Sequence, residues 1–231
     1  MTMSKMAISL AGAIILIAGA GLLAMTGASR GQSDGARAGD PALGSHVADA
    51  KCAECHGADC NSSESQFPKL AGQSPAYLYR QLWAFRNGTR RSDIMAPIAA
   101  DLGDADMANA SSFYGKQSRK ADAVKDQRLA AIGERIFFAG MPACAMCHRA
   151  SGQRGMPVTG MMGGGMMERM PMMGMMADAP YLNGQHAAYI VDQLDRFASG
   201  ARPSSTMMGR IAAALSEADK RAVAEYLSGL R

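Results

Sequence analysis

Apolar positions recur at helical spacing in two stretches of the chain that resemble each other. In the first stretch, Ser74 and Pro75 offer a helix cap and a proline at the first helical position. Apolar and aromatic side chains then recur at helical spacing up to Asn87 and Gly88, which favour a turn. The pattern predicts a helix between these signals, and a matching pattern that ends at Gly200 predicts a second helix.

The two stretches belong to a longer internal repeat. Residues 68–73 align with residues 180–185, and the following pairs also match: Tyr77 with Tyr189, Gln81 with Gln193, Leu82 with Leu194, Phe85 with Phe197, Gly88 with Gly200, and Arg90 with Arg202. Each half also ends in a predicted helix, Asp104 to Tyr114 and Ser216 to Leu230, and Ser216 and Asp219 resemble a capping box. The chain is therefore predicted to be all-α, with two tandem domains that arose by duplication.

The N-terminal segment predicts export from the cytoplasm. After Lys5, an uncharged apolar run extends from Met6 to Met25, which suits either a signal peptide or a membrane anchor. Either reading places the globular part in the periplasm, free or tethered to the inner membrane. The predicted organisation is a signal or anchor at 1–28, a flexible tether at 29–43, a first domain at 44–115, a linker at 116–127 and a second domain at 128–231.

Each half carries the motif Cys-x-x-Cys-His. The motif residues are Cys52, Cys55 and His56 in the first half and Cys144, Cys147 and His148 in the second. Two cysteines at this spacing can form thioethers with both vinyl groups of a haem, and the histidine that follows can bind the iron. Zinc or redox Cys-x-x-Cys sites do not explain a histidine directly after the second cysteine in both copies. The motifs predict two covalently attached c-type haems, and the fifth cysteine, Cys60, is predicted to pack passively.

Composition agrees with a cofactor inside each domain. Aromatic residues make up only 6% of the chain, so each small domain would have a thin core without the apolar volume of a haem. The formal net charge of +4 is offset by the propionates that two haems would bring. Nucleic-acid binding therefore has no support in the sequence.

The sixth iron ligand is predicted to lie between the middle and last helices of each half. When the Ile-Ala-Ala tripeptides of the two halves are aligned, Met95 pairs with Met208, and the thioethers of these residues are the predicted distal ligands. Met207 competes with Met208, because an alignment without a gap selects it instead. Outside the motifs the only histidines are His46 and His186, which are not duplicated and are predicted to be surface or capping residues.

A haem motif between helices and a helix at the end of each half is the layout of a class I cytochrome c. The sequence resembles the cytochrome c4 family from about Ala42 onward, in Cys52 to Asp59, Phe67 to Gln73, Gly140 to Cys144 and Gly184 to Tyr189. The resemblance implies two class I domains related by a pseudo-two-fold axis, haem edges close enough to exchange electrons, and delivery of electrons to a terminal oxidase.

These features favour an electron-transfer protein over an enzyme. His/Met ligation of both irons would leave no vacant coordination position for substrate chemistry. The leading hypothesis is a respiratory carrier that receives electrons from a quinol-oxidising complex or a dehydrogenase and passes them to a terminal oxidase. The alternatives are a cytochrome subunit that docks permanently on a periplasmic dehydrogenase and, less favoured, a di-haem peroxidase, against which the repeated methionine argues.

The second half departs from the first in an insertion rich in methionine and glycine, at about 152–178. Ten methionines lie between Met156 and Met176, and Gly163, Gly164, Gly165 and Pro171 disfavour a helix. Thioethers suit Cu(I), so copper binding is one reading. The favoured prediction is an adaptable surface loop, because no histidine or cysteine lies inside the tract to anchor a metal.

Overall fold

The computed structural model describes residues 39–140, 142–148 and 179–231. The predicted signal or anchor, residues 29–38 of the predicted tether and the whole methionine-rich insertion therefore lie outside the described residues. Among the residues that are described, no helix is long and apolar enough to cross a membrane.

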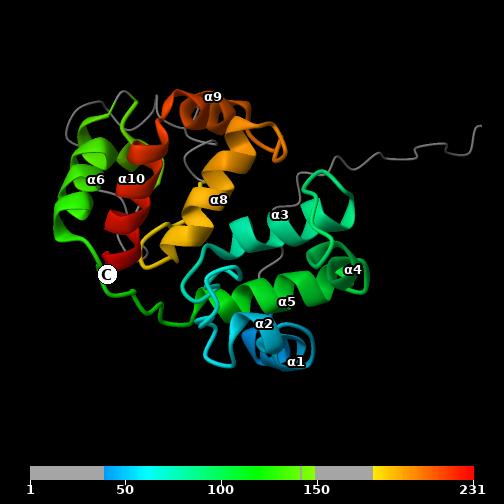
Figure 1. Ribbon diagram of the computed structural model, residues 1–231. Coiled ribbons are helices and arrows are strands. Elements are labelled where there is room, and N and C mark those ends of the chain that lie inside the picture. The colour runs from blue at the N-terminus through cyan, green and yellow to red at the C-terminus, as the bar shows by residue number, and fades with distance from the viewer. Residues whose placement is uncertain (1–38, 141, 149–178) are drawn as a thin grey trace, which may run out of the picture. The chain divides into compact units, whose positions relative to one another are not determined.

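In the described ranges, the regular elements of both halves are helices joined by turns and loops, and they follow the same order (Figure 1). The first half contains α1 (Pro41–Lys51), α2 (Ala53–His56), α3 (Pro75–Arg86), α4 (Met95–Ala100) and α5 (Asp104–Gly115). The second contains α6 (Gln127–Ala139), the 3₁₀ turn η1 (Cys144–Met146), α8 (Ala187–Ala198), α9 (Thr206–Ala214) and α10 (Glu217–Gly229). The predicted all-α duplication is confirmed.

Local capping explains where several helices begin. The Ser74 hydroxyl accepts a hydrogen bond from the Tyr77 N–H, and Pro75 opens α3 as predicted. The predicted capping box at α10 is confirmed, because Ser216 and Asp219 satisfy each other's backbone N–H groups. Helix α1 begins inside the range predicted as tether, because the Asp40 carboxylate accepts a hydrogen bond from the Ala42 N–H and caps it.

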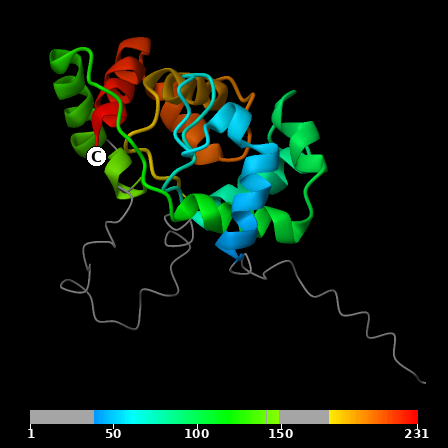
Figure 2. The same ribbon diagram turned by 90° about the horizontal axis from the view of Figure 1, so that it is seen from below.

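A glycine allows the first and last helices of each half to pack closely. Helix α1 packs against α5, and α6 packs against α10, and both views show these pairs side by side (Figures 1 and 2). A Cβ atom on Gly44 would lie 2.1 Å from the Asn109 carbonyl oxygen, and one on Gly133 would lie 1.9 Å from that of Ala222. Because such contacts are impossible, both crossings require glycine, and the duplication extends to the helix packing.

Each half has its own small apolar core. In the first half, Ala48, Leu78 and Tyr114 are buried against one another, which brings α1, α3 and α5 together. In the second half, Phe137, Ile190, Val223, Ala224 and Leu227 bring α6, α8 and α10 together. These cores fix the helices that border each haem motif.

Polar side chains at equivalent positions of the repeat join the two halves. Arg90 donates hydrogen bonds to the Tyr189 hydroxyl at 2.9 Å and to the Gln193 amide oxygen at 2.8 Å. Arg202 reciprocates toward Tyr77 at 3.0 Å and Gln81 at 2.9 Å. Burial raises the pKa of Tyr77, but the positive charges of Arg202 and Arg90 lower it further than burial raises it. The exchange of identical contacts in both directions is what a pseudo-two-fold relation between the halves requires.

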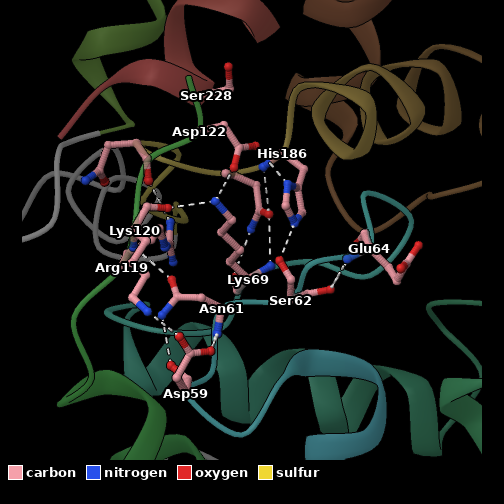
Figure 3. A network of polar contacts seen from close by, with 12 residues as sticks. Asp59, Asn61, Ser62, Glu64, Lys69, Arg119, Lys120, Asp122, His186 and Ser228 are labelled. Carbon is pink, nitrogen blue, oxygen red and sulfur yellow. Dashed lines mark hydrogen bonds and ion pairs between the residues drawn. The ribbon is translucent and has the colours of Figure 1, made fainter. Parts of the chain in front are cut away.

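The linker between the halves adds a contact that the repeat does not duplicate. Asp122 accepts hydrogen bonds from the Lys69 ammonium group and, at 2.8 Å, pairs with the His186 Nδ1 atom. The other ring nitrogen of His186 lies 2.9 Å from the Ser62 carbonyl oxygen, as Figure 3 shows. The side chain of Lys69 is only 4% exposed, so the pair with Asp122 neutralises a charge that is almost out of water. The linker therefore fastens the second half to the first.

Candidate haem sites

The first motif places its histidine by a backbone hydrogen bond. Cys52 precedes α2, and Cys55 and His56 lie on this single helical turn. The His56 ring is buried, and its Nδ1 atom lies 2.8 Å from the Pro68 carbonyl oxygen. Since a carbonyl can only accept, Nδ1 carries the proton and Nε2 is left with a free lone pair. This is the tautomer that an iron ligand needs.

The second motif repeats this arrangement. Cys144 begins η1, and Cys147 and His148 follow it directly. The buried His148 ring has its Nδ1 atom 3.1 Å from the Pro180 carbonyl oxygen. Pro68 and Pro180 are equivalent residues of the repeat, so the two imidazoles are oriented by equivalent backbone carbonyl groups. Sequence alignment matched these prolines, but it gave no reason to assign their carbonyl groups a role.

Burial keeps both imidazoles neutral. It lowers the pKa of His56 and of His148, and the hydrogen bonds to Pro68 and Pro180 oppose this only in part. The positive charge of Arg202 lowers the pKa of His148 further. Burial also raises the pKa of the Cys52 and Cys144 thiols. The histidines are thus held in the form that binds a metal.

The predicted distal methionines stand in equivalent places. The Met95 N–H donates to the Ser92 hydroxyl at 3.1 Å, and the Met208 N–H donates to the Ser205 hydroxyl at 3.2 Å. Met95 begins α4 and packs against the buried cluster that includes Phe85. Met208 lies in the first turn of α9 and is partly buried. The shared serine contact aligns Met95 with Met208.

Met207 differs from both of these methionines. Its side chain is 41% exposed. The ungapped alignment that selects it would also pair Ser92 with Ser204, whereas it is Ser205 that caps α9. A single additional residue between Arg202 and Ser205 therefore accounts for the gap in the alignment.

The donor set fits a c-type haem in each half. All five cysteines in the described part of the chain are free thiols, so the four motif cysteines are available for thioether bonds. Each motif also offers one neutral imidazole with a free Nε2 atom. A haem held by two thioethers and a histidine needs these groups and no others on its proximal side.

The other candidate residues fall outside the haem sites. His46 is exposed, as predicted. His186 occupies the N-cap position of α8, as predicted for a capping residue, but it does not lie at the surface: its side chain is buried between Asp122 and Ser62 and makes no capping hydrogen bond. Cys60 is buried in the first core, and burial raises the pKa of its thiol to about 11, which agrees with passive packing.

Comparisons with known proteins agree with this geometry. A family model described as Cytochrome c matches the chain twice, over residues 41–129 and 130–231. Cytochrome c4 of Pseudomonas aeruginosa is 36% identical, over 84% of this chain and 90% of that protein. A thiosulfate dehydrogenase electron acceptor of Stutzerimonas stutzeri is 33% identical, over 81% of this chain and 82% of that protein. The crystal structure of reduced recombinant cytochrome c4 from Pseudomonas stutzeri superposes with a TM-score of 0.68 at 32% identity, covering 84% of this chain and all of that one.

Two tandem domains of this kind define a di-haem c-type cytochrome, an electron-transfer protein that is not itself an enzyme. It holds two covalently attached c-type haems. The chain belongs to the cytochrome c4 family.

Proposed function

We propose that this protein is a periplasmic electron carrier in which His56 and Met95 ligate the first haem iron and His148 and Met208 ligate the second. Cys52 and Cys55 would form the thioethers of the first haem, and Cys144 and Cys147 those of the second. The observation that carries the proposal is that both halves have the same donor contacts: each has a buried histidine bound through Nδ1 to a proline carbonyl, and a methionine bound through its N–H to a serine.

The protein's own residues would hold each haem site rigid while its iron gains or loses an electron. A c-type haem supplies one-electron chemistry at its iron. The carbonyl groups of Pro68 and Pro180 keep each imidazole in one tautomer and one orientation, so little rearrangement accompanies a change of oxidation state. A methionine on the opposite side would fill the remaining position and exclude substrate. This favours electron transfer over peroxidase chemistry.

The contacts between the halves support electron exchange within one chain. Arg90 and Arg202 each bridge to the other half through hydrogen bonds of 2.8–3.0 Å. These bonds, together with the Lys69–Asp122–His186 contacts of the linker, oppose relative motion of the halves. A fixed separation would keep the rate of exchange between the two sites constant.

We infer a respiratory role, with a quinol-oxidising complex or dehydrogenase as donor and a terminal oxidase as acceptor. Export to the periplasm is supported by the uncharged apolar run from Met6 to Met25. A second candidate is a cytochrome subunit of a periplasmic dehydrogenase, which the similarity to a thiosulfate dehydrogenase electron acceptor favours. Purification from native membranes distinguishes them: a dehydrogenase that co-elutes at a constant ratio supports the subunit, and its absence supports the free carrier.

Substitution of the methionines tests the ligands. In Met208→Ala, the second haem should lose the long-wavelength band of a sulfur-to-iron bond, so that the band falls to about half, whereas Met207→Ala should leave it intact. Met95→Ala should remove the other half of the band. If Met207→Ala removes the band and Met208→Ala does not, the register proposed for the second half is wrong by one residue.

A further inference from the structure

The peptide group between Pro68 and Lys69 makes two hydrogen bonds in opposite directions. Its carbonyl oxygen lies 2.8 Å from the Nδ1 atom of His56. Its N–H, contributed by Lys69, donates to the amide oxygen of Gln185 at 2.9 Å. Gln185 belongs to the other half of the chain, so a single peptide group connects the first motif's histidine to a side chain of the second half.

The equivalent peptide group in the second half makes the reciprocal pair of bonds. The Pro180 carbonyl oxygen lies 3.1 Å from the Nδ1 atom of His148. The N–H of Tyr181 donates to the amide oxygen of Gln73 at 2.9 Å. Gln73 belongs to the first half. Each motif histidine is thus hydrogen-bonded to one peptide group, and that peptide group is hydrogen-bonded to a glutamine from the opposite half.

Both glutamines use the nitrogen and the oxygen of their amide groups in hydrogen bonds. The amide nitrogen of Gln185 donates to the Lys69 carbonyl at 2.9 Å, and that of Gln73 donates to the Tyr181 carbonyl at 3.0 Å. Each amide oxygen also accepts from the N–H of the residue that follows the glutamine. Both side chains are about 5% exposed, so solvent competes little for these bonds. Only glutamine has the length and the donor and acceptor that this pattern requires.

Hydrogen bonds in such a chain strengthen one another. An acceptor that pulls on the N–H of a peptide group increases the negative charge on its carbonyl oxygen. The carbonyl oxygen then accepts more strongly from the histidine Nδ1–H, and the opposite ring nitrogen becomes a better electron donor. A stronger donor stabilises the oxidised iron and lowers the reduction potential.

We propose that Gln185 and Gln73 are positioning residues that set the reduction potential of the haem in the opposite half. Gln185 lowers the potential of the first haem through the Pro68–Lys69 peptide group, and Gln73 lowers that of the second through the Pro180–Tyr181 group. The reduction potentials of the two haems are therefore set in part by the domain interface, in addition to any direct effect of one haem's charge on the other. This inference rests on the proposed ligation by His56 and His148.

The test is a crossed pair of substitutions in the intact di-haem protein. Gln185→Met preserves side-chain length and removes the hydrogen bonds, so the first haem's potential should rise while the second stays nearly constant. At a fixed applied potential, the ratio of reduced to oxidised first haem should increase roughly threefold or more, where tenfold corresponds to about 59 mV for one electron. Gln73→Met should shift the second haem instead. Spectroelectrochemistry gives the potentials, and the axial-methionine NMR signals, assigned with Met95→Ala, identify each haem.

A matched control is Gln193→Met. Gln193 lies at the same interface and accepts hydrogen bonds from Arg90 and Arg202, one arginine from each half, but it is not bonded to either peptide group. It should not shift one haem selectively. Gln185→Glu keeps an acceptor oxygen, so it should not raise the first haem's potential, and it provides a test if the methionine variant does not fold.

Three outcomes would overturn the proposal: equal shifts of both haems in each variant, a shift of the haem in the substituted residue's own half, or a raised first potential in Gln185→Glu. The failure of the ligand assignment is distinguishable from these. If the unsubstituted protein lacks the signals of two His/Met haems, the proposed ligation is wrong. If those signals are present and the crossed pattern is absent, only the role of the glutamines is wrong.

Discussion

Replacement of Gly133 by alanine probes the packing that positions the second haem motif. The added Cβ would lie 1.9 Å from the Ala222 carbonyl oxygen, 2.5 Å from the Ala222 carbonyl carbon and 2.9 Å from the Tyr226 Cβ atom. Two of these atoms belong to the backbone of α10 and cannot rotate away. Helices α6 and α10 must therefore separate by more than an ångström, which loosens the core around Phe137 and Leu227.

The expected cost follows from two opposing effects. Overpacking of a core costs roughly 1–3 kcal/mol and occasionally more, and a backbone-to-backbone clash belongs at the upper end. Alanine is favoured over glycine inside a helix by about 1 kcal/mol. We expect a net loss of about 2 kcal/mol in the free energy of unfolding. In a chain of this size, that loss should lower the thermal midpoint by roughly 4–8 °C.

The assay is thermal unfolding of the holoprotein, followed by far-ultraviolet circular dichroism and by haem absorbance. Gly209→Ala is the matched control, because its Cβ would meet its nearest atom, the Phe197 carbonyl oxygen, at 3.4 Å. The first half already has Ala96 at the equivalent position. Gly209→Ala should be neutral or stabilising by up to about 1 kcal/mol. Equal midpoints for the two variants would refute the argument that α6 and α10 require a glycine at their crossing.

Three further predictions concern the second haem, the linker and the insertion. Mass spectrometry should find two haem additions on the mature protein, and Cys147→Ser should weaken attachment at the second site only; one addition or none on the unsubstituted protein would contradict the di-haem assignment. Burial raises the pKa of Asp122, but its bonds to Lys69 and His186 lower it overall, so its stabilising effect is present above the ordinary value of 3.8 and lost as pH falls through the lowered pKa. The Asp122→Asn variant should therefore have a lower free energy of unfolding near neutral pH, and it should lose less of that free energy as the pH falls. Urea unfolding at several pH values measures both effects. An unchanged acid slope would argue against this role. Deletion of residues 156–176 should preserve both haem spectra, because the first half has no counterpart of this insertion; loss of the second haem's spectrum would show that the insertion supports it, and tight, stoichiometric Cu(I) binding by the intact protein would favour the copper reading.

Features that repeat within the sequence were predictable, because each depends on local chemistry. The haem motifs, the capped helices and the alignment of Met95 with Met208 all came from residues close together in the chain. The close approaches at Gly44 and Gly133 were not predicted, since they depend on which residue of a distant helix faces each glycine. A duplicated glycine in the first helix of each half is the signal that could have indicated them.

Features that depend on the linker could not be read from the repeat. The burial of His186 was not predicted, because it requires Asp122 and Ser62, which are distant in sequence and have no equivalents in the alignment. Gln73 and Gln185 were recognised as equivalent residues, but equivalence alone does not reveal that each contacts the other half. Reciprocal contacts become visible only when the two halves are placed together.

The absorbance of the oxidised protein at long wavelength reports directly on the ligands of both irons. A sulfur-to-iron bond gives a weak band there, and its intensity per chain reports the number of methionine-ligated haems. The proposed pairs, His56 with Met95 and His148 with Met208, predict the intensity of two such haems for each chain. An intensity equal to one haem, or a band typical of bis-histidine ligation, would contradict the equivalence of the two sites.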